Sequence, residues 1–121
     1  MSLIHEGEKP IFQQIRETIE DAILDGTLQA EDRIPSINEF AKQYQINPAT
    51  ANKGVNELVE KAVIYKKRGV GMYVSAEAKQ ILIQERKERF EQSFLLPLVH
   101  EANRLGITVE ELQMMLGRVS K

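Results

Sequence analysis

Apolar residues recur about every three or four positions along much of the chain, which is the spacing of amphipathic helices. One such pattern covers residues 11–23, and Pro10 is placed at its first helical position. A shorter pattern covers residues 37–44, where Ser36 and Glu39 have the spacing of a capping box. The first third of the chain therefore predicts two helices joined by a short connection.

A third helix is predicted from Pro48 to about Glu60, with Asn47 as its N-cap. The positions of this segment that we expect to face the core are Ala51, Val55, Leu58 and Ala62. A turn of about four residues separates this helix from the one before it. Two short helices joined in this way form a helix-turn-helix.

Two strands are predicted after the third helix, Ile64–Lys67 and Met72–Val74, around a glycine-containing turn. A hairpin in this place makes the unit a winged helix-turn-helix. From Ala76 a long helix is predicted to about Arg104, with a kink or break just before Pro97.

The predicted fold is thus mainly α with a small β-hairpin. A winged helix-turn-helix domain occupies residues 1–75, and a helical tail occupies residues 76–121. The tail ends with a short helix that begins at a second capping box, Thr108 with Glu111. Its apolar positions are Phe90, Phe94, Leu95, Leu98, Val99, Ala102, Leu105, Leu112, Met115 and Leu116.

Composition limits the possible functions. The chain has 121 residues, of which 42% are hydrophobic, and it has no cysteine, so we expect one modest core without disulfides or thiolate metal sites. No apolar run is long enough to span a bilayer and no signal peptide precedes the domain, which predicts cytoplasmic residence without a membrane partner. His5 and His100 lack a catalytic context, and the carboxylates are expected on solvated helix faces. We therefore expect neither an enzyme nor a cofactor.

Charge is distributed unevenly along the chain. The net charge is −2, but residues 42–73 hold six Lys and Arg against two Glu, a balance of +4. Residues 1–41 hold three basic against nine acidic residues, a balance of −6. A polyanion would therefore be attracted to the middle of the chain only.

The predicted third helix and the hairpin carry the candidate chemistry. The outer face of the helix is slim, polar and non-acidic at Ala49, Thr50, Asn52, Lys53 and Asn56. A helix of this kind can enter a major groove and bond to base edges. The tip of the hairpin combines two glycines with three basic residues: Lys66, Lys67, Arg68, Gly69 and Gly71. Helix capping, a tight turn and a solvated basic hairpin are the purely structural explanations of the same residues.

Residues 10–74 resemble the DNA-binding domain of the GntR family of bacterial transcription regulators. The matching segments are "PIFQQIRETIEDAILDGTL", "DRIPSINEFAKQYQINPATANKGVNELVEKAVI" and "RGVGMYV". The form "NPAT" and the short tail are similar to the YtrA-like subfamily, whose members dimerise through a two-helix tail and commonly repress ABC-transporter operons. The resemblance therefore implies a homodimeric repressor.

The resemblance also implies which residues contact DNA. The reading head would comprise Ser36, Asn38, Asn47, Ala49, Thr50, Asn52 and Lys53, and the wing contact would comprise Lys66, Lys67, Arg68, Gly69 and Gly71. Family members often have Arg in place of Asn38, and some have Arg in place of Pro48 and Asn52. Because Asn pairs with adenine, a relatively A·T-rich operator is our hypothesis. Ala62 stands where glycine is usual before the wing.

The sequence thus predicts a cytoplasmic, DNA-binding repressor that binds a palindromic operator as a homodimer, with its apolar tail as the dimer interface. Packing of the tail on its own N-terminal domain is the simpler alternative for that face. One alternative function is a winged-helix module for protein–protein assembly with an idle DNA face. Another is a small-molecule sensor, with a site between the two tail helices or at the dimer seam; the effector is unknown.

Overall fold

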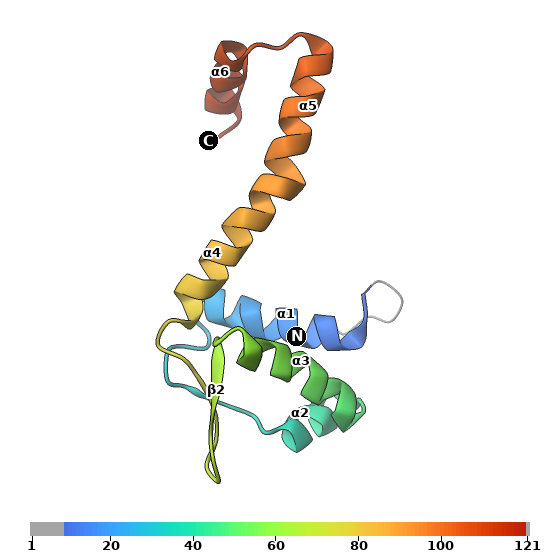
Figure 1. Cartoon of the computed structure of the whole chain (residues 1–121), viewed down its shortest axis with the longest axis vertical. Helices are drawn as coiled ribbons and strands as arrows, with labels where there is room; N and C mark the ends of the chain where they lie inside the picture. Colours follow the sequence, from blue (N-terminus) through green and yellow to red (C-terminus); the bar gives the residue numbers. More distant parts are fainter. Residues whose placement is uncertain (1–8, 121) are drawn as a thin grey trace. The chain divides into compact units, whose positions relative to one another are not determined.

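Two helices, α1 (Ile11–Leu24) and α3 (Pro48–Glu60), lie side by side in the N-terminal unit (Figure 1). The computed structural model describes residues 9–120, so His5 lies outside the described residues. The chain divides into two compact units, residues 1–84 and residues 85–121. The first unit also contains α2 (Ile37–Tyr44), a small sheet and the first half of α4 (Ala78–Phe90).

The contact between α1 and α3 repeats once per helical turn. Three pairs of side chains bridge the two helices, and the members of each pair are 41 positions apart in the sequence: Phe12 with Lys53, Arg16 with Glu57, and Glu20 with Lys61. Because successive pairs are four residues apart on both sides, the two helices run in the same direction along this contact. Beside these pairs, the buried apolar faces of α1 and α3 pack into the core.

Glu20 corrects our expectation that the carboxylates lie on solvated helix faces. Its side chain is fully buried, and its Oε2 lies 2.9 Å from Nζ of Lys61 and 3.5 Å from Nε of Arg16. The sequence pattern of α1 alone does not show this burial, because α3 covers that position from 41 residues away. A buried carboxylate is tolerated only with such partners, since an unpaired one costs several kcal/mol.

Gly54 lets α3 approach the backbone of α1 closely. A Cβ atom built at this position would lie 2.5 Å from the carbonyl oxygen of Phe12 and 3.4 Å from the Ile15 side chain. Glycine inside a helix normally costs about 1 kcal/mol relative to alanine. Here its missing side chain sets the distance between the two helices.

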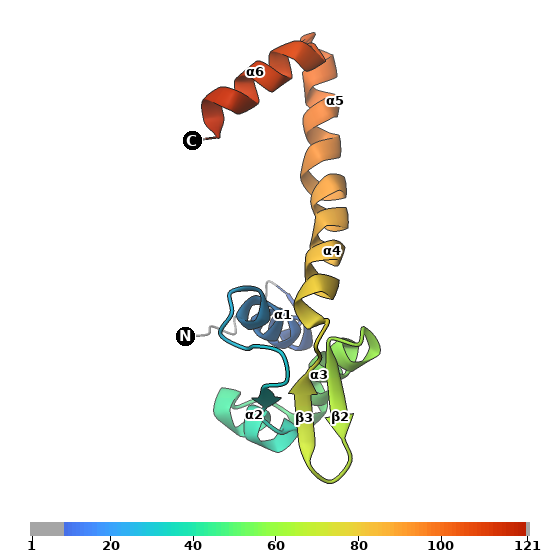
Figure 2. The same ribbon diagram turned by 90° about the vertical axis from the view of Figure 1, so that its left-hand side faces the viewer.

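The hairpin predicted from the sequence belongs to a three-stranded antiparallel sheet. Its strands are β1 (Arg33–Ile34), β2 (Ile64–Lys67) and β3 (Gly71–Val74), in the order β1-β3-β2. Figure 2 shows β2 and β3 as the two arms of the wing. The sequence analysis missed β1, because two residues before a proline carry no readable periodicity.

The core of the first unit lies between the helices and the inner face of the sheet. Residues of every element contribute to it: Ile15, Ile19 and Ile23 of α1, Phe40 and Ala41 of α2, Ala51, Val55 and Leu58 of α3, Ile34, Ile64, Met72 and Val74 of the sheet, and Ala78 and Leu82 of α4. The described residues include no helix long and apolar enough to cross a membrane.

The sequence pattern predicted that Ala62 faces the core, and this prediction is wrong. Ala62 is exposed, with a left-handed backbone (φ +65°), and Val63 is buried in its place. This conformation explains why glycine is favoured here, since a Cβ atom disfavours it. Because the chain changes direction at Ala62, the residue that faces the core is Val63.

Two predicted helix starts are shifted. Pro10 occupies the N-cap of α1 and not the first helical position, and its carbonyl oxygen accepts bonds from the N–H groups of Gln13 and Gln14. The tail helix begins at Ala78 and not at Ala76. The starts of α2 and α3 agree with the prediction, because their caps specify them.

In the C-terminal unit, the helix passes Pro97 without breaking. A π-helical turn, η1 (Glu91–Leu95), leads directly into α5 (Leu96–Leu105). The N–H of Leu96 bonds to the carbonyl of Glu91, five residues back. The wider turn before the proline relieves the clash that its ring would make in a regular helix. Of the predicted kink or break, the break does not occur, and the helix is instead widened locally before Pro97.

The last helix, α6 (Val109–Val119), begins at the capping box predicted from the sequence. Gly106 ends α5 in a left-handed conformation (φ +72°). Thr108 Oγ1 then accepts a bond from the N–H of Glu111, and Glu111 accepts one from the N–H of Thr108. Local signals therefore define both helix ends.

We predict that Gly54→Ala lowers the free energy of unfolding by roughly 1–3 kcal/mol, because a backbone carbonyl stands where the methyl group would go. Gly117→Ala in α6 is the matched control. No atom lies within 4 Å of a Cβ atom there, so helix propensity alone predicts a gain of up to about 1 kcal/mol. Urea unfolding followed by circular dichroism measures both values. Equal effects of the two substitutions would contradict the close approach.

Candidate nucleic-acid interface

The N-terminal end of α3 presents small polar residues to solvent. Asn47 Oδ1 accepts a bond from the N–H of Ala49 at 2.8 Å, and the Asn47 carbonyl accepts one from the N–H of Thr50 at 3.0 Å. Ala49 and Asn52 are exposed, and no acidic residue lies in the first turn. This end of a helix carries a partial positive charge, which favours a phosphate.

The cap does not use all the hydrogen-bonding capacity of Asn47. Its side-chain oxygen is engaged within the helix, whereas its amide group donates no bond that the structure shows. Structural capping and nucleic-acid contact are therefore compatible at this position, as the sequence indicated.

Lys53 lies at the seam between α3 and α1. Its side chain is exposed, and its ammonium nitrogen lies 4.0 Å from the centre of the Phe12 ring. A cation in this position is attracted to the ring by about 0.5–1 kcal/mol when exposed. The contact holds the ammonium group at the edge of the outer helix face, where it suits a phosphate better than a base.

The start of α2 adds the next predicted contacts. Ser36 Oγ accepts a bond from the N–H of Glu39 at 3.1 Å, and Glu39 Oε1 accepts one from the N–H of Ser36 at 2.8 Å. The bonds from the backbone and hydroxyl of Ser36 hold the pKa of the Glu39 carboxyl below its usual value, helped by the charge of Arg33. The first turn of α2 is thus fixed, and Asn38 is exposed on it.

The wing turn is open and basic. Lys66, Lys67, Arg68 and Gly69 are exposed, and Gly69 adopts φ +75° at the turn. The N–H of Val70 closes the turn on the Lys67 carbonyl at 2.9 Å. Lys67 also lies over the Tyr73 ring, 4.9 Å from its centre, which holds its ammonium group over the sheet.

The structure adds two residues at the wing that the sequence analysis did not select. Val70 is an apolar side chain that is 58% exposed at the tip, and Arg33 lies on β1 beside β3. A valine between two glycines was a usable signal, because proteins that insert into a minor groove use apolar side chains. Arg33 had no such signal, since its position depends on the unpredicted strand.

Two charged residues of the basic middle segment have structural roles instead. Lys61 is paired with the buried Glu20, and Glu57 is paired with Arg16 at 2.7 Å. Within the 42–73 segment, the cations without such a role are therefore Lys42 on α2, Lys53 on α3, and Lys66, Lys67 and Arg68 of the wing. Within residues 9–120, no three His, Cys, Asp or Glu side chains gather in a way that could hold a metal ion.

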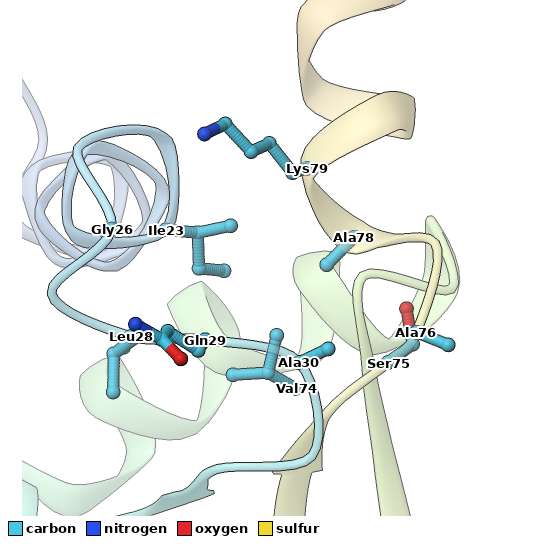
Figure 3. Close-up of a pocket in the computed structure, with 10 residues that line it drawn as sticks. All are labelled: Ile23, Gly26, Leu28, Gln29, Ala30, Val74, Ser75, Ala76, Ala78 and Lys79. Atoms are coloured by element: carbon cyan, nitrogen blue, oxygen red, sulfur yellow. The ribbon is translucent and has the colours of Figure 1, made fainter.

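A cavity of about 290 Å³ opens between the end of α1, the loop that follows it and the start of α4. Its lining is mixed, because Ile23, Leu28, Val74 and Ala78 are aliphatic, whereas Gln29, Ser75 and Lys79 are polar or charged (Figure 3). None of the predicted DNA contacts lines it. The cavity is therefore separate from the predicted DNA-binding residues.

Comparison with known proteins decides the identity of the fold. Bacterial regulatory proteins of the GntR family match residues 11–74, which include the helix-turn-helix and the wing. The chain belongs to this family. The HTH-type transcriptional repressor YtrA of Bacillus subtilis (strain 168) is 30% identical over 111 residues, which are 92% of this chain and 85% of YtrA. The predicted YtrA-like character of this GntR-family chain is thereby confirmed.

Solved structures agree with the predicted winged helix. A putative GntR-family regulator from Bacteroides thetaiotaomicron is 34% identical, with a TM-score of 0.77 over 89% of this chain and 94% of that one. The DNA-binding domain of AraR, solved in complex with operator ORX1, is 27% identical, with a TM-score of 0.54 over 62% of this chain and 90% of that domain. This GntR-family chain is a DNA-binding transcriptional regulator and not an enzyme.

We predict that Asn52→Ala relaxes base discrimination at one adenine of each half-site by about 1–3 kcal/mol, because an Asn amide can bond to both N6 and N7 on the major-groove edge of adenine. Affinity for unrelated DNA should stay unchanged. Competition titrations with operators altered at single positions measure this. Asn103→Ala in α5 is the control, and it should leave discrimination intact. Selection of G-rich half-sites by the unmodified protein would contradict the adenine assignment.

Proposed function

We propose that this protein is a cytoplasmic, homodimeric repressor that occupies a palindromic operator, with each protomer reading one half-site. The N-terminal half of α3 enters the major groove, the wing contacts the adjacent backbone or minor groove, and occupancy blocks transcription. Control of a transporter operon follows from the resemblance to the YtrA-like subfamily. The predicted contact residues in α2, α3 and the wing carry this function.

The observation that carries the proposal is the composition of the outer face of α3. Its N-terminal half exposes Ala49, Asn52 and Lys53, whereas its acidic residues, Glu57 and Glu60, lie toward the other end. The slim, non-acidic face fits a major groove, and the positive end of the helix dipole favours the backbone beside it. Relatives that are named repressors support the regulatory outcome.

The C-terminal unit supports the dimer. Large apolar side chains are exposed on it, among them Phe90 (56%), Phe94 (65%) and Leu105 (64%) on the long helix and Leu116 (54%) on α6. Ala102 is the exception among the predicted interface residues of α5, because it is already buried within the single chain. Single exposed apolar residues are common, but a cluster of this size indicates an interface. A second copy of the chain matches the two-fold symmetry of a palindrome.

A salt titration tests DNA binding itself. Each protomer has four predicted phosphate-binding cations, Lys53, Lys66, Lys67 and Arg68, so a dimer has eight. Eight contacts predict a loss of affinity of about 10³–10⁵-fold between 50 and 200 mM salt. Fluorescence polarisation with the upstream region of the gene, at several salt concentrations, measures this. Weak binding that is indifferent to salt would instead favour the protein-assembly module.

We predict that Phe94→Asp converts the dimer into a monomer, because the new carboxylate would be buried in an apolar interface. Affinity for the palindrome should fall about 10²–10⁴-fold as the two half-sites are no longer bound together, with affinity for a single half-site retained. Asn103→Asp introduces the same charge on the same helix and should remain dimeric. Analytical ultracentrifugation and polarisation titrations give both readouts. A dimeric Phe94→Asp protein would contradict this interface.

A further inference from the structure

The outward face of the wing sheet carries cations and aromatic rings together. β3 alternates between half-buried and buried positions, so Gly71 and Tyr73 face outward while Met72 and Val74 face the core. The rings of Tyr65 and Tyr73 stack with their centres 5.9 Å apart, and the Tyr65 hydroxyl donates a bond to the Glu31 carboxylate. Arg33 pairs with Tyr73 across β1 and β3, which places Arg33 on the same face.

Arg33 extends along this face toward the wing turn. A Cβ atom built on Gly71 would lie 3.0 Å from Nε of Arg33 and 3.6 Å from its Cζ and Nη2. The guanidinium group therefore lies over the bare backbone of Gly71. Because Gly71 pairs with Lys67, Arg33 and Lys67 flank this backbone from the two neighbouring strands. The absence of a side chain at Gly71 therefore leaves room for the Arg33 side chain, in addition to allowing the backbone conformation of the turn.

The cations on this face are not neutralised by direct ion pairs, although Arg33 lies near enough to Glu39 for its charge to lower the pKa of that carboxyl. In the described part of the chain, neither Arg33 nor Lys67 makes an ion pair, and Lys67 is held over Tyr73 instead. Arg33 and Lys67 are on the two strands that flank β3. Their unneutralised charges attract a polyanion to this face.

We propose that Arg33 binds a phosphate group of the operator, so that the contact extends from the wing turn, across the outward face of the sheet, to the first turn of α2. This proposal rests on the DNA-binding function above. Arg33 is a positioning residue for the complex, since phosphate contacts fix register and orientation without reading sequence.

A phosphate is favoured over a base for two reasons. The guanidinium lies over the backbone of Gly71, behind the turn formed by Arg68 and Gly69, so it does not protrude from the tip that would enter a groove. Its planar fork also matches two phosphate oxygens at once. The charge of Arg33 near Glu39 shows that it lies beside the capped start of α2, where Ser36 and Asn38 are the next predicted contacts.

Arg33→Gln tests the assignment in the full-length protein. We expect binding about tenfold weaker and a plot of log affinity against log salt that is less steep by about two per dimer, one for each lost phosphate contact. The loss should be equal for the operator and for unrelated DNA. Arg118→Gln in α6 removes the same charge and should change neither value. Arg33→Lys should keep the salt slope, and melting curves should show all three variants folded.

The outcomes separate this inference from the function on which it rests. If the unmodified protein binds DNA steeply with salt but Arg33→Gln keeps the same slope, the Arg33 contact is wrong and the proposed function stands. A loss confined to particular flanking sequences would also overturn it, because it would show base reading. Salt-insensitive binding by the unmodified protein would overturn the function itself.

Discussion

The close contact between α1 and α3 is the constraint on which the rest of the first unit depends. Gly54 allows the two helix backbones to approach closely. Pairs of side chains that are 41 positions apart in the sequence then connect α1 and α3 along their length. The buried Glu20 fixes one end, through Lys61, and the Phe12 ring fixes the other, through Lys53. Breaking one partner of a buried ion pair costs about 3–5 kcal/mol, so the orientation of α3 is strongly specified.

The position of the predicted DNA-binding surface follows from this orientation. One face of α3 packs against α1 and the core, so only a narrow face remains exposed to solvent. Ala49 and Asn52 lie on this exposed face. The same helix leads through the left-handed Ala62 into β2, so the position of the wing is tied to that of α3. Arg33, brought in by β1, joins the wing to the start of α2. One packing contact therefore aligns three separate groups of predicted contacts.

Signals that act within a few residues were readable from the sequence. Ser36 with Glu39 and Asn47 with Pro48 specify the starts of α2 and α3, and the structure confirms both. Features that depend on distant segments were not readable. The burial of Glu20 needs a helix 41 residues away, and the role of Arg33 needs a two-residue strand that forms only against β3. At Pro97 the sequence predicted a disturbed helix, but the proline alone does not specify that the turn before it widens into a π-turn.

The most direct test of the account is the map of backbone amide chemical-shift changes on adding operator DNA to the labelled protein. The account predicts large changes at residues 33–38, 47–53 and 66–71, at the starts of α2 and α3 and at the wing. Residues 109–119 of α6 should change little. Changes concentrated in the C-terminal unit, with α3 and the wing unaffected, would contradict the claim that this surface binds DNA.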